Sequence, residues 1–125
     1  MNRKEFGEFL ESIGGLENGY FPNRPQIKDP GFFMVGDGWL LLIKNLIEEL
    51  IAIGWDRQIC QVKEKFGGLR FYANDVPDGG LEIISRYEDL SYKTCETCGS
   101  TENITQTKGW ITTICQTCLN KKEKK

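Results

Sequence analysis

The chain has 125 residues, of which 39% are apolar and 11% aromatic, enough to build the core of one modest domain. It contains no histidine, which excludes Ser-His and Cys-His nucleophile pairs, HExxH zinc hydrolases and any side chain whose unperturbed pKa is near neutrality. The formal charge is −2, and because the last five residues contribute +3, the body before them carries −5. Such a body is not typical of a general duplex-DNA binder, which needs basic charge to release counterions from phosphates.

The first predicted element is a short amphipathic helix over residues 2–13. Asn2 and Glu5 have the spacing of a capping box, and apolar residues recur at helical intervals up to Ile13. Residues 14–38 hold three of the four prolines and six of the fourteen glycines, so we expect a long irregular segment there. Its aromatic side chains are expected either to pin the loop to the core or to line a binding loop or lid.

A second helix is predicted from Gly38 to Ile53, with Asp37 as its N-cap and Gly54 closing it. Its polar residues form one narrow stripe, and apolar residues cover the rest of its surface. A surface this apolar is typical of a helix wedged into the core. It is also typical of a helix that uses one face for self-association, so a homo-oligomer through residues 38–53 is the alternative interpretation.

Residues 59–73 predict a β-hairpin with Gly67-Gly68 as its two-residue type I′ turn. This turn places Lys65 opposite Arg70, and strand alternation then divides the side chains between two faces. The face toward the core is expected to carry Cys60, Val62, Phe66, Leu69, Phe71 and Ala73, with Glu64 as a misfit. The opposite face is expected to carry Gln61, Lys63, Lys65, Arg70, Tyr72 and Asn74.

The second face combines three cations with an aromatic side chain and holds no acid. Like charges directly opposite on neighbouring strands destabilise a hairpin by roughly 0.2–1 kcal/mol. Either an anionic ligand relieves this repulsion, or the face is simply solvated or neutralised by an acidic helix over residues 82–89. Both interpretations stay open at this point.

A third helix, predicted over Leu81–Thr94, leads directly into a cysteine-rich segment. Its inward side chains are expected to be Ile83, Ile84, Tyr87 and Leu90. The two CxxC pairs that follow are separated by sixteen residues, the spacing of a four-cysteine zinc site, and their members are Cys95, Cys98, Cys115 and Cys118. One zinc ion per chain with four protein ligands has no open coordination position and is therefore structural.

Alternatives for these cysteines are a redox-active CxxC pair or paired disulfides. A helix starting near Cys115 would make the module a treble clef, and without that helix it would be a zinc ribbon. The fifth cysteine, Cys60, is expected to be a small buried apolar residue.

Together these elements predict an α+β fold, with a small antiparallel hairpin or sheet packed by helices and a C-terminal four-cysteine zinc ribbon or treble-clef module. We expect a core over residues 1–94, the zinc module over residues 95–120 packed on it, and a basic tail over residues 121–125. The start of the chain leads into no apolar signal-peptide core, and the apolar runs are too short to span a bilayer. A cytoplasmic location and no membrane partner are therefore expected.

Several of these motifs together resemble a family of small proteins encoded by phages, prophages and bacteria. The residues that carry the resemblance are Gly36-Asp37-Gly38-Trp39, the run VKEKFGGLRFY from Val62 to Tyr72, Ser91, Cys95-x2-Cys98-Gly99, Gly109-Trp110 and Cys115-x2-Cys118. The resemblance covers about residues 36–118, and the hairpin motif is its most specific part. It implies a phage-type protein in the host cytoplasm, of the kind that binds nucleic acid as a regulator or blunts host defence.

Three functions are compatible with these features. The first is a non-catalytic protein that binds or sequesters a small phosphate-bearing ligand, such as a signalling nucleotide. Its candidate ligand-binding residues are Lys63, Lys65 and Arg70 for phosphates, Tyr72 or the loop aromatics Tyr20 and Trp39 for stacking, and Arg24 from the loop. The second is a zinc protein that binds single-stranded nucleic acid or modulates transcription, in which Lys93, Lys108, Trp110 and the lysine tail add to the basic strand face. The third is a protein-interaction adaptor. No paired-carboxylate or phosphate-loop motif supports an enzyme.

Overall fold

A four-stranded sheet organises the larger part of the molecule. The computed structural model describes residues 1–21 and 23–123. The central strand β3 (Gln58–Lys65) pairs antiparallel with β4 (Gly68–Ala73), and two short strands, β1 (Glu17–Asn18) and β2 (Phe33–Met34), pair parallel with β3. Because β4 occupies one edge of β3, the two short strands lie end to end along its other edge. The sheet is therefore mixed, whereas the sequence predicted only antiparallel pairing.

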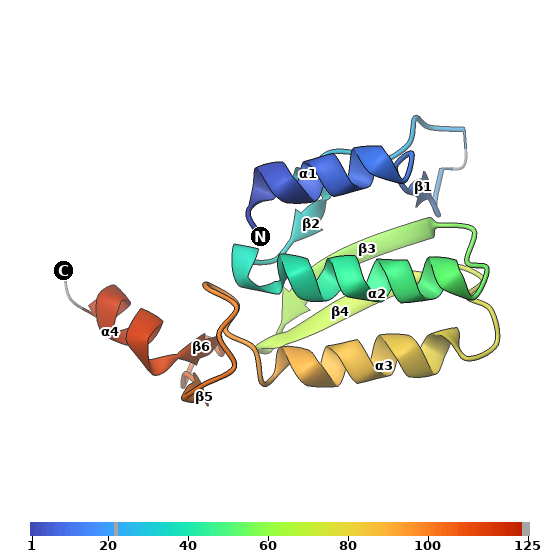
Figure 1. Ribbon diagram of the computed structural model, residues 1–125. Coiled ribbons are helices and arrows are strands. Elements are labelled where there is room, and N and C mark those ends of the chain that lie inside the picture. Colours follow the sequence, from blue (N-terminus) through green and yellow to red (C-terminus); the bar gives the residue numbers. More distant parts are fainter. Residues whose placement is uncertain (22, 124–125) are drawn as a thin grey trace.

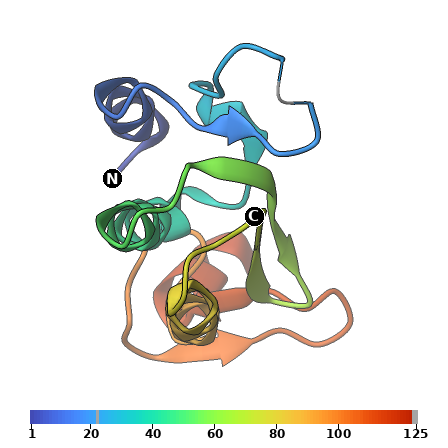
Figure 2. The ribbon, with the colours of Figure 1, turned by 90° about the vertical axis from the view of Figure 1, so that its right-hand side faces the viewer.

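Three helices cover one face of this sheet: α1 (Arg3–Ser12), α2 (Leu40–Ala52) and α3 (Gly80–Ser91) (Figures 1 and 2). Single-turn 3-10 helices at Pro30–Phe32 and Asp37–Trp39 precede β2 and α2. The core between helices and sheet consists of fully buried side chains, among them Phe6, Leu10, Phe33, Trp39, Ile43, Leu46, Ile47, Leu50, Ile59, Val62 and Leu69. No described helix lies on the opposite face, which we call the open face (Figure 2).

The N-terminal helix has the start that its sequence predicts. The Asn2 side chain accepts a hydrogen bond from the backbone N–H of Glu5, and the Glu5 carboxylate accepts one from the Asn2 backbone, which completes the capping box. The predicted cap of α2 is wrong. Asp37 makes no capping hydrogen bond to α2 and instead pairs with Arg3, whose Nε lies 2.9 Å from the Asp37 carboxylate.

Helix α2 lies between α1 and α3 and buries most of its apolar surface inside the chain. Leu41 and Ile53 remain exposed, and Leu42 and Ile51 are half-buried. The wedged helix is thus the arrangement observed, and self-association through residues 38–53 stays a prediction. No helix in the described ranges is long and apolar enough to cross a membrane.

The β3–β4 hairpin differs from its predicted register by two residues. Lys63 pairs with Arg70 and Lys65 with Gly68, so the turn residues are Phe66 and Gly67, both at positive φ (53° and 82°). A shift of two residues keeps the strand side chains between Gln61 and Lys65, and those of β4, on their predicted faces. At the turn itself the prediction is wrong for Phe66, which is exposed instead of in the core.

Two other side chains lie away from the core in which they were expected. A bulge between Ile59 and Gln61 turns Cys60 toward Asn74, with its Sγ 3.3 Å from Asn74 Oδ1, so Cys60 is half-buried outside the core. In α3, Ile84 is buried and Ile83 and Tyr87 pack against the core, but Leu90 is 40% exposed.

The C-terminal module consists of a second hairpin and a helix. Strands β5 (Ile104–Gln106) and β6 (Thr113–Cys115) pair antiparallel, and α4 (Gln116–Glu123) begins directly after Cys115. Lys121 and Lys122 of the predicted basic tail belong to α4, and residues 124–125 lie outside the described part of the chain. The overall class is mixed helix and sheet, as predicted.

Candidate functional site

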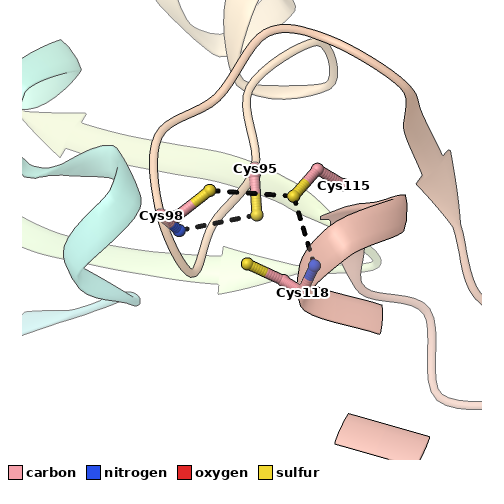
Figure 3. A group of neighbouring side chains, drawn as sticks. All are labelled: Cys95, Cys98, Cys115 and Cys118. Atoms are coloured by element: carbon pink, nitrogen blue, oxygen red, sulfur yellow. Dashed lines mark hydrogen bonds between the residues drawn. The ribbon is translucent and has the colours of Figure 1, made fainter. Parts of the chain in front are cut away.

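The four cysteines of the two CxxC pairs converge on one point (Figure 3). All four Sγ atoms lie within 4.8 Å of one another. Cys95 and Cys98 come from the loop after α3, Cys115 ends β6 and Cys118 lies in the first turn of α4. The loop, the strand and the helix together bring in ligands from both ends of the module.

The spacing of the sulfur atoms fits a tetrahedral metal ion. Four sulfurs bound at about 2.3 Å would lie about 3.8 Å apart, and the Sγ atoms of Cys98 and Cys115 are 3.7 Å apart. Within each pair the second cysteine points its backbone N–H at the first sulfur, at 3.5 Å for Cys95 and 3.4 Å for Cys115 (Figure 3). These four residues can therefore hold one metal ion.

Electrostatics in the cluster favour a bound cation. Burial acts to raise the pKa of Cys95, but hydrogen bonds from backbone N–H groups, that of Cys115 first, outweigh burial and lower the pKa to about 6. Burial, reinforced by the neighbouring thiols of Cys115 and Cys98, raises the pKa of Cys118 to about 12. Four thiolates at this spacing repel one another, and a divalent cation between them neutralises that repulsion.

The first cysteine pair is held against the core by the segment Gly36–Trp39. The backbone N–H of Gly38 donates to Glu96 O at 2.8 Å, and that of Gly36 donates to the Glu96 carboxylate at 2.9 Å. A Cβ atom at Gly38 would lie 2.2 Å from Cys95 O, so only glycine permits this approach. Trp39 completes the joint by donating from Nε1 to Thr94 O at 2.9 Å.

Trp39 is therefore not a ligand-stacking residue. Its side chain is 0% exposed, and its indole N–H is already bonded to Thr94 O. The sequence prediction was wrong because the burial of Trp39 depends on the cysteine module, which lies more than fifty residues away along the chain.

The hairpin tip provides a second joint between the module and the core. Thr113 is fully buried, and its hydroxyl donates to Gly67 O. Glu64, the predicted misfit on the core face, accepts a hydrogen bond from the backbone N–H of Gly67 at 2.7 Å and so closes the turn. Much of the motif that resembles the phage-type family thus joins the module to the sheet.

The predicted basic cluster lies on the open face of the sheet. Lys63 is directly opposite Arg70, Tyr72 is opposite Gln61, and Met34 of β2 lies beside Lys63 on the same face. Within residues 1–21 and 23–123, the five ion pairs at 4.0 Å or less involve none of the three strand cations. The structure therefore brings Lys63, Lys65, Arg70 and Tyr72 onto one surface.

Arg70 differs from the two lysines because its guanidinium has hydrogen-bond partners within the protein, one of them Tyr92 directly after α3. Its guanidinium donates to the hydroxyl of Tyr92 at 3.2 Å and to Leu69 O at 3.1 Å. The hydrogen bond to the Tyr92 hydroxyl raises the pKa of Arg70. Burial acts against this shift, and the negative charge of Glu88 adds to it. Lys63 and Lys65 are the strand cations that make no such hydrogen bonds within the described chain.

Arg24 lies in the loop between β1 and β2. Its guanidinium stands over the ring of Phe21, 5.2 Å from the centroid, beside a shallow hollow that Tyr20 and Asn23 also line. That Arg24 binds a ligand together with the strand cations stays a prediction.

Of the exposed aromatic side chains around this hairpin, Trp110 and Tyr20 are candidates that the sequence already offered, whereas Phe66 was expected in the core. Phe66 and Trp110 are 67% and 84% exposed, and both line a hollow of about 210 Å³ together with Lys65. Tyr20, 64% exposed, lies in the loop after β1, which pairs with β3 at the other end of the hairpin. The exposure of Phe66 could have been predicted from a turn at Phe66-Gly67, because a turn residue has no strand partner and its side chain does not join the core face.

Comparison of the chain with models of protein families, with curated proteins and with solved structures found no match. The relationship to the phage-type family stays a prediction from the motifs.

Proposed function

We propose that this protein is a non-catalytic binding protein whose open sheet face takes a single-stranded nucleic acid, while a structural zinc ion holds the C-terminal module in place. The observation that carries the proposal is the open face itself. It presents Lys63 directly opposite Arg70, with Lys65 and Tyr72 on the same surface and no ion pair to any of the three cations within the described residues.

Zinc is the metal that best fits four cysteine ligands in a cluster of tetrahedral dimensions. The order of cysteine knuckle, hairpin and helix is that of a treble clef, because α4 begins directly after Cys115. Four thiolate ligands fill the coordination shell, so the ion supports the fold and does not activate water. The absence of histidine from the chain further supports a binding role.

The length of the open face supports an extended ligand. The Tyr92 ring covers Gly68 at one end of β4, and the five residues from Leu69 to Ala73 span about 17 Å at roughly 3.3 Å per residue, which is on the scale of the shortest single-strand sites, about 4 nucleotides. Two aromatic side chains accompany the cations, Tyr72 on the open face and Phe66 at the hairpin tip. Alternating cations and aromatic rings are what a single strand needs, because phosphates take the charges and bases stack on the rings.

The proposal is tested by binding of a labelled oligothymidylate, followed by fluorescence anisotropy over a range of salt concentrations. Three phosphate contacts predict that log K falls with log salt at a slope of about −2, since each contact to a single strand contributes roughly 0.7. The variant K63A/K65A should weaken binding and reduce the slope to about −0.7.

The matched control is K4A, which removes an exposed cation from α1 on the helical side of the sheet. It should leave both affinity and slope unchanged. Equal slopes for wild type and K63A/K65A, or no binding at low salt, would contradict the proposal.

A small phosphate-bearing ligand, such as a signalling nucleotide, is the second candidate. The charge count favours it, because only three strand cations share the open face in a chain of net charge −2, which suits a compact anion. A thermal-shift panel of cyclic and adenine dinucleotides separates the two candidates, since a specific ligand raises the melting temperature by mass action. A shift with a dinucleotide and none with oligothymidylate would favour sequestration of the small ligand.

A further inference from the structure

Two large aromatic side chains flank a hollow at the joint between the two hairpins. Phe66 is in the β3–β4 turn and Trp110 is in the loop between β5 and β6, and with Lys65 and Ile111 they line a space of about 210 Å³. Both rings are mostly exposed, at 67% and 84%. Burying rings of this size against another surface would remove a large apolar area from water.

The turns that carry these rings are internally braced. Phe66 has a φ of 53°, an uncommon conformation for an aromatic residue, and the Glu64 carboxylate stabilises the turn by accepting from Gly67 N–H at 2.7 Å. The Trp110 loop is closed by Thr107, whose hydroxyl donates to Trp110 O at 2.8 Å and accepts from Thr112 N–H at 2.9 Å. Each ring is therefore presented from an ordered backbone, which lowers the entropy lost on binding.

The two turns are also fixed relative to each other. The Thr113 hydroxyl donates to Gly67 O, and the position of a Cβ on Gly67 would be only 2.9 Å from the Ile111 side chain. The hollow is thus formed by direct contact between the sheet and the zinc module.

Charge decides what kind of group fits the hollow. The Glu64 carboxylate is part of its lining and disfavours a phosphate inside it. Lys65 also lines the hollow, with its Nζ 5.6 Å from the centroid of the Phe66 ring, and continues the row of cations on the open face. These charges favour a flat, uncharged ring inside the hollow, with an attached phosphate toward Lys65.

From this arrangement we infer that the hollow is a nucleobase-binding subsite, in which a base stacks on Trp110 and Phe66 while its phosphate contacts Lys65. The inference rests on the proposed function, because the subsite takes one base of a strand that runs along the open face. A volume of about 210 Å³ is below the roughly 300–1,000 Å³ of pockets for larger ligands and suits a single base.

Tryptophan fluorescence reports on this subsite directly. Of the three tryptophans, Trp39 and Trp55 are 0% and 4% exposed, so only Trp110 is accessible to a ligand. Two probes of equal phosphate number are titrated, an eight-nucleotide oligothymidylate and an abasic strand of the same length. The oligothymidylate should quench the emission, and the abasic strand should bind without quenching.

Affinity measurements on variants complete the test. Trp110→Ala should weaken oligothymidylate binding about tenfold, which corresponds to about 1.4 kcal/mol, and leave abasic-strand binding unchanged. Trp110→Phe should restore part of the loss. The control Leu41→Ala, an exposed apolar residue on α2, should bind like wild type.

The outcomes separate the subsite from the wider function. If oligothymidylate binds wild type and Trp110→Ala equally and quenches nothing, the subsite is refuted and binding on the open face stands. If neither probe binds, the proposed function is refuted and the subsite with it.

Discussion

The joint between Gly38 and the first cysteine pair allows a sharp prediction about how the C-terminal cysteine module is attached to the core. In the variant Gly38→Ala the new Cβ would lie 2.2 Å from Cys95 O, 2.5 Å from Gly99 N and 2.7 Å from the Glu96 carbonyl carbon. All three neighbours are backbone atoms, so no side chain can rotate away. The cysteine loop must move outward, and the hydrogen bond from Gly38 N to Glu96 O is lost with it.

The expected loss of stability follows from these two effects. Overpacking of one methyl group costs about 1–3 kcal/mol, and a lost backbone hydrogen bond adds about 1 kcal/mol. A total of about 3 kcal/mol, with an unfolding entropy of roughly 2.1 cal/mol/K for each residue, lowers the melting temperature by about 10 °C. Zinc affinity should fall as well, because Cys95 moves with the displaced loop.

Differential scanning calorimetry of the zinc-loaded protein measures the effect, and Gly54→Ala is the control. Gly54 has a φ of 97° and no atom within 4 Å of its Cβ position, so alanine there costs only the strain of a left-handed residue, roughly 1–2 kcal/mol. Gly38 does not have a positive φ, so the loss of stability in Gly38→Ala comes from the steric clash and not from backbone strain. A Gly38→Ala protein that melts within 2 °C of wild type would refute the contact between this segment and the cysteine loop.

Three further predictions concern the metal, the module joint and a titrating tyrosine. Elemental analysis should find one zinc per chain, and chelation or Cys98→Ser should lower the melting temperature; an unchanged melting curve after zinc removal would contradict a structural ion. Thr113→Val leaves Gly67 O without its buried hydrogen-bond donor and should lower the free energy of unfolding in urea by about 1–3 kcal/mol. A Thr113→Val protein as stable as wild type would refute the hydrogen bond between the module and the hairpin turn. Burial, together with the hydrogen bond that the Tyr87 hydroxyl donates to Glu49, raises the pKa of Tyr87 to about 12. The contribution of the neutral Tyr87 to the free energy of unfolding is fully present below about pH 10 and is lost as pH rises through about 12. Tyr87→Phe should therefore lose less stability than wild type over this range. Parallel pH profiles of stability for the two proteins would contradict this assignment.

Local patterns predicted the parts of the fold that depend on neighbouring residues. The capping box of Asn2 and Glu5 fixed the start of α1, and the spacing of the cysteines identified the metal cluster. Alternation along the hairpin assigned the strand side chains to their faces even though the register was wrong. This happened because the true turn, Phe66-Gly67, differs from the predicted one by a shift of two residues, which preserves the side-chain period.

The features that sequence reasoning missed depend on contacts between distant segments. Strands β1 and β2 have two residues each and exist through parallel pairing with β3, which no local periodicity indicates. Trp39 is buried because Thr94 and the cysteine loop cover it. The hollow beside Phe66 and Trp110 forms only when the two hairpins meet.

The most direct test of the binding surface is an NMR titration of the zinc-loaded, ¹⁵N-labelled protein with a short single-stranded oligonucleotide. The account predicts that backbone amide shifts change along β3 and β4 and at Gly109–Ile111, while amides of α1 and α2 stay unchanged. Changes confined to the helical side, or no change at saturating oligonucleotide, would contradict binding on the open face.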